Sequence, residues 1–325
     1  MKMNVKRRAF AAVVFAGAAL LATPLHAQPD KPMRVILPVS AGSGVDAIVR
    51  AMGPQLGKAL GQPIVIENLP GAGGITGTTA IVKAPPDGQT IGVLSNNHVI
   101  NPSVFKSLPY DTLADVTPIM VVGSTPFVLV VNPTKLPASN VKELVALLKA
   151  KPGTFNYASS GNGTIIHLAG ALFGEEAGVD IKHVPYKGTG PMVSDLIAGH
   201  VDLGVVAVPA VQGHLKAGTL RAVGVGTDQR IPQLPDVPTF VEQGLPNYVI
   251  GGWFTVVGPP KLPAAEVKRI HAAFTAALAT PELREAMASQ GNIISPTTPE
   301  AAAQYMRSEQ DRYAKLINKI GLKPE

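Results

Sequence analysis

The sequence feature that most constrains the fold is a repeated alternation of short runs rich in valine and isoleucine with longer amphipathic patterns. Short continuous apolar runs are typical of buried parallel strands, and apolar residues spaced three and four apart are typical of helices. Glycine and proline separate the two kinds of segment, as they do in β-α-β units. We therefore predict an α/β fold with mostly parallel strands.

The positions of these segments predict how the chain is divided. Strands are predicted at residues 33–37, 63–66, 90–94, 127–131, 154–158, 181–184, 202–206, 220–225 and 253–257, and the last of them is followed by helices at residues 264–278, 282–289 and 299–320. This grouping indicates a chain that leaves a first domain near residues 124–127 and returns near residues 251–253. We expect lobe 1 to comprise residues 28–126 and 252–325, and lobe 2 residues 127–251.

Residues 1–27 have the pattern of a secretory signal peptide. Basic residues precede an apolar run at residues 9–22, and cleavage is expected near Ala27. The run is shorter than the roughly 18 to 20 residues that cross a bilayer. The chain has no cysteine, so it cannot form disulfides in an oxidising compartment. We predict a periplasmic protein.

Net charge argues against a nucleic-acid ligand. The chain has 28 basic and 22 acidic residues, and the leader accounts for Lys2, Lys6, Arg7 and Arg8, so the mature net charge is 24 − 22, or +2. Aromatic residues make up 5% of the chain and no basic cluster is present. The electrostatic pattern of a nucleic-acid-binding protein is therefore missing from the sequence.

Two glycine-rich loops, residues 38–46 and 157–164, each lie between a predicted strand and a predicted helix. The N–H groups at a helix N-terminus can bind an anion. Ligands of open α/β sheets lie outside the carboxyl ends of the strands, so both loops should face one cleft. Pro54 falls inside the helix predicted at residues 45–60 and should either kink that helix or restart it.

Six motifs then occur in register along the chain. They are residues 37–46, 68–74, 84–88, 157–163 with 167–170, 184–188 and 234–239. With these motifs the chain resembles, over essentially its whole mature length, the extracytoplasmic solute receptors of the tripartite tricarboxylate transporter family, often called Bug receptors. The resemblance implies a type II periplasmic binding protein fold, with two lobes joined by two crossing segments and a ligand cleft between them.

The resemblance also implies partners and a site. The expected ligand is a small mono-, di- or tricarboxylate, the expected protein partners are membrane permease subunits, and the receptor is expected to be a monomer without a cofactor, a metal or catalytic residues. The implied ligand-binding residues are Val39, Ser40, Ala41, Gly42, Ser43, Gly44, Asp46, Gly74, Thr76, Ser95, Asn97, His98, Ser159, Ser160, Gly161, Gly163, Thr164, His167, Lys187 and Ala207. Asp46 has the alternative role of stabilising its own helix, and His167 that of a packed core histidine.

Departures from the family pattern bear on the ligand. They make the rim of the pocket more apolar, and they are Val39, Ser43, Val45, Leu69 and Ile75. Relatives often have an acid near Ala207, where this chain has none, and the ammonium group of an amino acid would need a carboxylate. We therefore predict a non-amino organic acid, aromatic or aliphatic.

An exported dinucleotide-binding oxidoreductase is the alternative function. Gly42, Gly44 and Ala47 fit a loose G-x-G-x-x-A pattern, and Glu67 ends the next predicted strand, where an acid would bind ribose. Export argues against a soluble nicotinamide cofactor. A hydrolase is disfavoured because no G-x-S-x-G motif is present, and the histidines lack the spacing of metal ligands.

Overall fold

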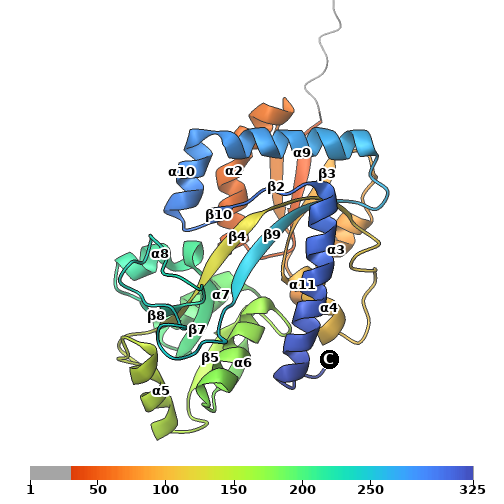
Figure 1. Ribbon diagram of the computed structural model, residues 1–325. Helices are drawn as coiled ribbons and strands as arrows, with labels where there is room; N and C mark the ends of the chain where they lie inside the picture. Colours follow the sequence, from red (N-terminus) through yellow and green to blue (C-terminus); the bar gives the residue numbers. More distant parts are fainter. Residues whose placement is uncertain (1–30, 325) are drawn as a thin grey trace, which may run out of the picture. The chain divides into compact units, whose positions relative to one another are not determined.

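The computed structural model describes residues 31–324 (Figure 1). The predicted signal peptide lies outside the described residues. The strands are β1 (Met33–Leu37), β2 (Ile64–Asn68), β3 (Thr90–Ser95), β4 (Thr117–Val131), β5 (Asn156–Ser159), β6 (Lys182–Pro185), β7 (Leu203–Ala207), β8 (Arg221–Val225), β9 (Gly251–Gly258) and β10 (Ile293–Ile294). The α-helices are α2 (Gly44–Leu60), α3 (Ile75–Val82), α4 (Asn97–Val104), α5 (Val141–Ala150), α6 (Ile165–Ala177), α7 (Thr189–Ala198), α8 (Val208–Lys216), α9 (Ala264–Ala279), α10 (Pro281–Ser289) and α11 (Pro299–Lys319).

The strands are hydrogen-bonded in the order β2-β1-β3-β9-β4-β7-β5-β6. Strand β1 is parallel to β2 and β3, and β5 is parallel to β6 and β7. In the first group β1 lies in the middle, β2 at the outside and β3 next to β9. In the second group β5 lies in the middle, β6 at the outside and β7 next to β4. Because β1 precedes α2 and β5 precedes α6, the two glycine-rich loops occupy equivalent positions in the two groups.

Strand β4 continues through the segment where the sequence predicts a crossing. It is antiparallel to β9 up to Pro126 and antiparallel to β7 from Phe127 onward. The predicted strand at residues 127–131 is therefore the second half of one long strand, and Figure 1 shows β4 and β9 running side by side. Pro126 is accommodated where β4 changes partner, since a proline lacks the N–H that a continuous ladder needs.

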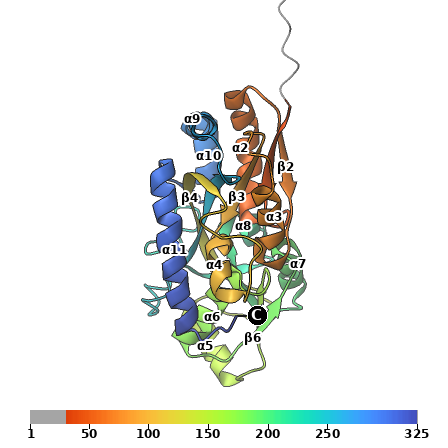
Figure 2. The ribbon, with the colours of Figure 1, turned by 90° about the vertical axis from the view of Figure 1, so that its right-hand side faces the viewer.

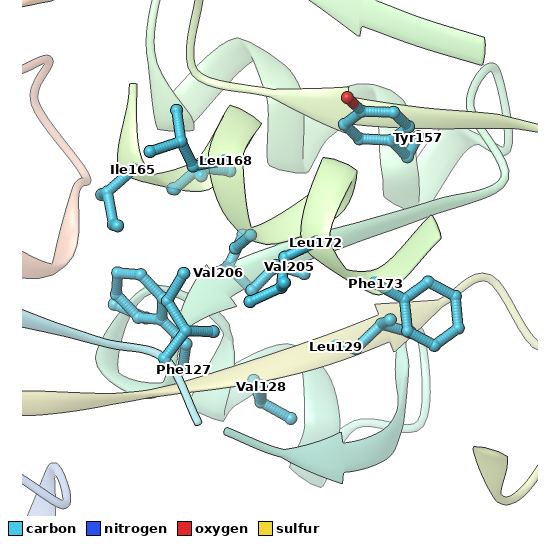
Figure 3. Close-up of a cluster of buried hydrophobic side chains, with 14 of the residues drawn as sticks. Phe127, Val128, Leu129, Tyr157, Ile165, Leu168, Leu172, Phe173, Val205 and Val206 are labelled. Carbon is cyan, nitrogen blue, oxygen red and sulfur yellow. The ribbon is translucent and has the colours of Figure 1, made fainter. Parts of the chain in front are cut away.

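Two groups of buried side chains pack on the sheet. One joins β1, β3 and the first part of β4 to α2, α9 and α10. The other joins the second part of β4 to β5, β7 and α6, and in Figure 3 side chains of α6 such as Leu172 and Phe173 lie against Leu129 of β4 and Val205 of β7. These apolar contacts hold the first turns of α2 and α6 in fixed positions.

Helix α2 is continuous through Pro54. The proline removes the N–H that would bond to the carbonyl of Arg50. Both residues are exposed, so water can bind that carbonyl, and the helix is neither broken nor restarted. On another side of the molecule, α11 packs against α4 and β4 (Figure 2).

Candidate functional site

A cavity of about 550 Å³ lies at the carboxyl ends of the parallel strands. It is lined by Pro38, Val39, Ser40, Pro70, Gly71, Ala72, Gly73, Gly74, Asn97, Phe105, Ser160, Gly161, Asn162, Thr164, Pro185, Tyr186, Lys187, Gly188 and Thr189. Both glycine-rich loops contribute to this lining. We call residues 38–43 the first loop and residues 159–164 the second loop.

A smaller cavity of about 60 Å³ adjoins the first, since Val39, Asn97, Ser160 and Thr189 line both. The first turn of α2 and the first turn of α6 border it with Gly44, Val45, Ile165 and Ile166. Its remaining lining residues are Ser43, Ser95, Asn96, Thr125, Phe127, Ala207, Gly252 and Trp253. The positive ends of two helix dipoles therefore meet at a space with room for a few heavy atoms.

The first loop is held by a buried carboxylate. Asp46 accepts hydrogen bonds from the N–H of Gly42 at 3.0 Å, from Arg50 Nε at 2.9 Å and from Asn68 Nδ2 at 3.0 Å. Burial alone would raise the pKa of Asp46, but these hydrogen bonds outweigh it and hold the pKa below its usual value. Gly42 has a φ of 79°, which a glycine adopts without strain. Asp46 thus shapes the loop and does not line either cavity.

The second loop is held by its own hydroxyl groups. Thr164 caps α6, and its Oγ1 accepts from the N–H of His167 at 3.3 Å and donates to the carbonyl of Gly161 at 2.8 Å. The N–H of Gly161 donates to Ser159 Oγ at 3.1 Å. Gly163 has a φ of 68°, and a Cβ there would lie 2.5 Å from Val104 of α4. Only glycine allows this loop to approach α4 so closely.

Direct contacts join the two walls of the cavity. The N–H of Thr189 donates to Ser40 Oγ at 3.0 Å, and the N–H of Ile165 donates to Asn97 Oδ1 at 2.8 Å. At Gly44, an added Cβ would lie 2.7 Å from the Cβ of Ala207. The walls are therefore in a closed arrangement.

The structure brings most of the predicted site residues to these cavities. Those that line one or both are Val39, Ser40, Ser43, Gly44, Gly74, Ser95, Asn97, Ser160, Gly161, Thr164, Lys187 and Ala207. The others lie outside the lining and are Ala41, Gly42, Asp46, Thr76, His98, Ser159, Gly163 and His167. Several of the latter support the loops, as Asp46, Ser159 and Gly163 do.

Two of the residues outside the lining are histidines with structural contacts. His98 is 3% exposed and its Nε2 lies 2.6 Å from the carbonyl of Thr112. His167 Nδ1 accepts from the N–H of Gly163 at 3.1 Å, and its ring stacks on His183. Both side chains thus have contacts within the protein, and whether either acts on a ligand stays a prediction.

Several residues that line the cavities are absent from the set of ligand-binding residues predicted from the sequence. Phe105 reaches the larger cavity from just after α4, and Thr125 of β4 and Trp253 of β9 reach the smaller one. Thr125 is 4% exposed, and its Oγ1 has no hydrogen-bond partner among residues 31–324. No local motif marks these positions, because they meet the loops only through the tertiary fold.

The charges at the site favour an anion. Lys187 is the one ionised side chain that lines the two cavities within the described part of the chain, and no carboxylate lines them. Tyr186 donates to Asp195 Oδ2 at 2.8 Å, and burial followed by that carboxylate raises the pKa of Tyr186 to about 12. Tyr186 therefore stays uncharged beside Lys187. Glu67, the proposed ribose acid of the alternative function, pairs with Arg34 at 2.7 Å instead.

Residues 31–324 contain neither a cluster of metal-ligand type nor a helix of membrane-spanning type. No cluster of three or more histidine, aspartate or glutamate side chains that could hold a metal ion is found among them. In the same part of the chain, every helix is too short or too polar to span a bilayer.

The sequence and fold match known proteins. Residues 48–322 match the family described as "Tripartite tricarboxylate transporter family receptor". The protein BugT of Bordetella pertussis is 34% identical over 325 residues, which cover 99% of each chain. A structure of R. palustris Rpa4515 with adipate is 30% identical with a TM-score of 0.88, and the match covers 91% of this chain and 99% of that one.

A second structure, MatC from Rhodopseudomonas palustris with bound malate, is 28% identical with a TM-score of 0.83, and the match covers 89% of this chain and 100% of that one. The mixed α/β periplasmic binding protein fold expected from the sequence is thereby confirmed. The matched family is one of solute receptors and not of enzymes, which removes the oxidoreductase alternative. The chain belongs to the receptor family of the tripartite tricarboxylate transporters.

Proposed function

We propose that this receptor captures a small organic dicarboxylate between two lobes in the periplasm and delivers it to a tripartite tricarboxylate-type membrane permease. The observation that carries the proposal is that the first turns of α2 and α6 border one small cavity from which acidic side chains are missing among the described residues. Free N–H groups and two positive dipole ends suit a carboxylate. We assign the first carboxylate of the ligand to this cavity.

Hydroxyl and amide groups add to the binding free energy that the two helix ends contribute. A helix end contributes on the order of 0.3 to 2 kcal/mol, whereas micromolar affinity needs roughly −8 kcal/mol. Ser43, Ser95, Asn97 and Thr125 border the same small cavity and supply further donors. Enclosure by the closed walls removes water and strengthens each of these contacts.

The larger cavity suits the rest of the ligand. Val39, Phe105 and Pro185 give it apolar wall area, and Lys187 supplies a cation. A short carbon chain can contact the apolar wall while a second carboxylate pairs with Lys187. The lining lacks a carboxylate for an ammonium group, which supports a non-amino acid. The dicarboxylates adipate and malate in the two solved relatives agree with this ligand class.

Capture requires opening, and we propose the lobe boundaries expected from the sequence: residues 28–126 with 252–325, and residues 127–251. The change of partner of β4 between Pro126 and Phe127 and the start of β9 at Gly251 support these boundaries. A ligand stabilises the closed form only through contacts that the open form lacks. The bond between Ser40 and Thr189 is one contact of the closed form.

A ligand panel tests the proposal on purified mature protein that has been unfolded and refolded to remove bound compounds. Thermal shift and calorimetry would compare adipate, malate, hexanoate and glutamate. A ligand at 100 times its Kd adds about 2.7 kcal/mol of stability. We expect a dicarboxylate to bind more tightly than hexanoate, and Lys187→Met to remove that difference. Tighter binding of glutamate, or no binding of any carboxylate, would contradict the proposal.

A further inference from the structure

Two histidine rings stack against each other beside the second loop. The ring centroids of His167 and His183 lie 3.7 Å apart, and the ring planes differ by 5°. Tyr157 of β5 stacks on His183 with a centroid distance of 5.0 Å. His167 comes from the first turn of α6, which follows the second loop, and His183 comes from β6, which is hydrogen-bonded to β5 before the loop.

Each histidine binds one end of the second loop. His183 Nε2 lies 2.6 Å from Ser159 Oγ, the hydroxyl that also accepts from the N–H of Gly161. His167 Nδ1 accepts from the N–H of Gly163 at 3.1 Å. The residues between these anchor points, such as Ser160, line the cavities. The imidazole pair thus fixes the stretch of backbone that faces the ligand.

The contact between Gly163 and His167 needs an uncharged His167 ring. A nitrogen that accepts a hydrogen bond carries no proton, so the bond from Gly163 requires His167 without a proton on Nδ1. A charge on either ring would lie a stacking distance from the other, and His167 is buried while His183 is half-buried. Burial, followed by the neighbouring His167, lowers the pKa of His183 to about 4. Burial also raises the pKa of Tyr157, so the phenol remains uncharged.

The acidic groups of the surrounding elements have other partners. On α7, Asp195 accepts from Tyr186 and His200. Asp202, just before β7, accepts from the N–H of Asn156 at 2.8 Å, and Glu176 of α6 pairs with Lys319 at 2.6 Å. None of these carboxylates is among the contacts of the His183 ring in residues 31–324, so a protonated His183 ring would have no carboxylate in contact with it there.

We propose that the stacked, uncharged pair of His167 and His183 positions the second loop for the ligand carboxylate, and that protonation of the pair in acid loosens the loop and weakens binding. The inference rests on the proposed function, because it assigns a role in carboxylate binding to side chains that do not touch the cavities. Both histidines are positioning residues. Their effect on the ligand passes through Ser159 and Gly163.

The first test needs no ligand. Amide NMR spectra of the ligand-free protein would be recorded from pH 7.5 to 4, with the ring protons of His167 and His183 followed in parallel. We expect the amides of Gly161 and Gly163 to shift with the midpoint of the histidine rings. Amides that do not follow the rings would overturn the inference, whether or not a carboxylate binds.

The second test compares two substitutions of one ring. His183→Gln keeps a polar group at the position of Nε2 for Ser159 without a titrating ring, whereas His183→Phe keeps an apolar ring without the hydrogen bond. With adipate at pH 7.5, we expect His183→Phe to bind roughly 3- to 10-fold more weakly than wild type, as for one lost hydrogen bond. We expect His183→Gln to bind within about threefold of wild type.

Binding measured at acid pH distinguishes a positioning role of His183 from a purely structural one. Between pH 7.5 and 4.5 wild type should lose roughly threefold or more affinity for adipate beyond the loss of His183→Gln, because the loosened loop lets the ring take up a proton. Protonation of adipate itself affects both proteins equally, so it cancels when their losses of affinity are compared. Equal losses in both proteins would overturn the inference. If no carboxylate of the panel binds wild type at pH 7.5, the proposed function fails, and the NMR titration still decides the inference on the histidine pair.

Discussion

The side-chain oxygen of Ser40 accepts a 3.0 Å hydrogen bond from the backbone N–H of Thr189, and this bond joins the first loop to the start of α7 across the larger cavity. A Cβ at the neighbouring Gly188 would collide with the Ser40 hydroxyl, so the two walls are in contact at this point. The closed state thus contains a bond that opening would break.

Ser40→Ala should weaken ligand binding without unfolding the protein. Loss of one hydrogen bond costs about 0.5 to 1.5 kcal/mol, which corresponds to roughly a 3- to 10-fold higher Kd. Calorimetry with adipate would measure the change. Ser194→Ala is the matched control, because this serine is exposed on α7 and its hydroxyl bonds to its own helix. Equal affinities of wild type and Ser40→Ala would show that the bond does not favour the closed state.

Gly44→Ala should prevent full closure. An added Cβ would lie 2.7 Å from the Cβ of Ala207, a distance that forces the two walls apart. Gly44 has no positive φ, so the helix itself tolerates alanine. We expect at least about a tenfold loss of affinity, equivalent to 1.4 kcal/mol, with little change in Tm.

A second substitution checks the cause of that loss. Ala207→Gly removes the opposing Cβ, so the double variant should regain most of the affinity that Gly44→Ala loses. The chain has one tryptophan, Trp253, which lines the small cavity, and its fluorescence can report binding in all three proteins. A double variant no better than Gly44→Ala would point to a cause other than this contact.

The loops were predictable from the sequence because their signals are local. A strand, a glycine-rich turn and a helix cap follow one another within a few residues at Ser43 and at Thr164, and the structure has the predicted arrangement at both. The order of the motifs also indicated the receptor family, and the matches to known proteins confirm that family. The roles of individual site residues remain predictions.

Other features depend on contacts between distant segments. The continuity of β4 through Pro126 arises because β9 and β7 supply partners on either side of it, and those partners lie far along the chain. Likewise, the stack of His183 on His167 and the unpaired hydroxyl of Thr125 exist only after folding. Spacing in one sequence contains no signal for such contacts.

Thr125→Val should weaken binding while leaving stability unchanged or higher. The buried Oγ1 of Thr125 has no partner among residues 31–324 and borders the cavity assigned to the first carboxylate. Valine has nearly the same shape and removes a polar atom whose burial is costly. We expect roughly a 3- to 10-fold higher Kd for adipate and no decrease in the urea midpoint. A clear loss of stability would show that the hydroxyl has a structural partner instead.

The free energy of unfolding should fall as the pH drops from about 6.5 to 4, and His98 should account for part of the fall. Burial lowers the pKa of His98 to about 4, although the carbonyl of Thr112 and the charge of Asp111 act in the opposite direction. Its Nδ1 is buried without a partner among the described residues, so a proton there would have no acceptor. Between these pH values the unfolded chain therefore binds a proton that the folded chain does not.

The sign follows from linkage: stability rises with pH wherever the unfolded state binds more protons, so acid destabilises the fold in this window. The full effect of one histidine is on the order of 3 kcal/mol, reached near pH 4. Urea denaturation at several pH values would measure it. His98→Gln should flatten the dependence, because its amide can still donate to the carbonyl of Thr112 without titrating. An unchanged slope in His98→Gln would mean that this ring titrates alike in both states.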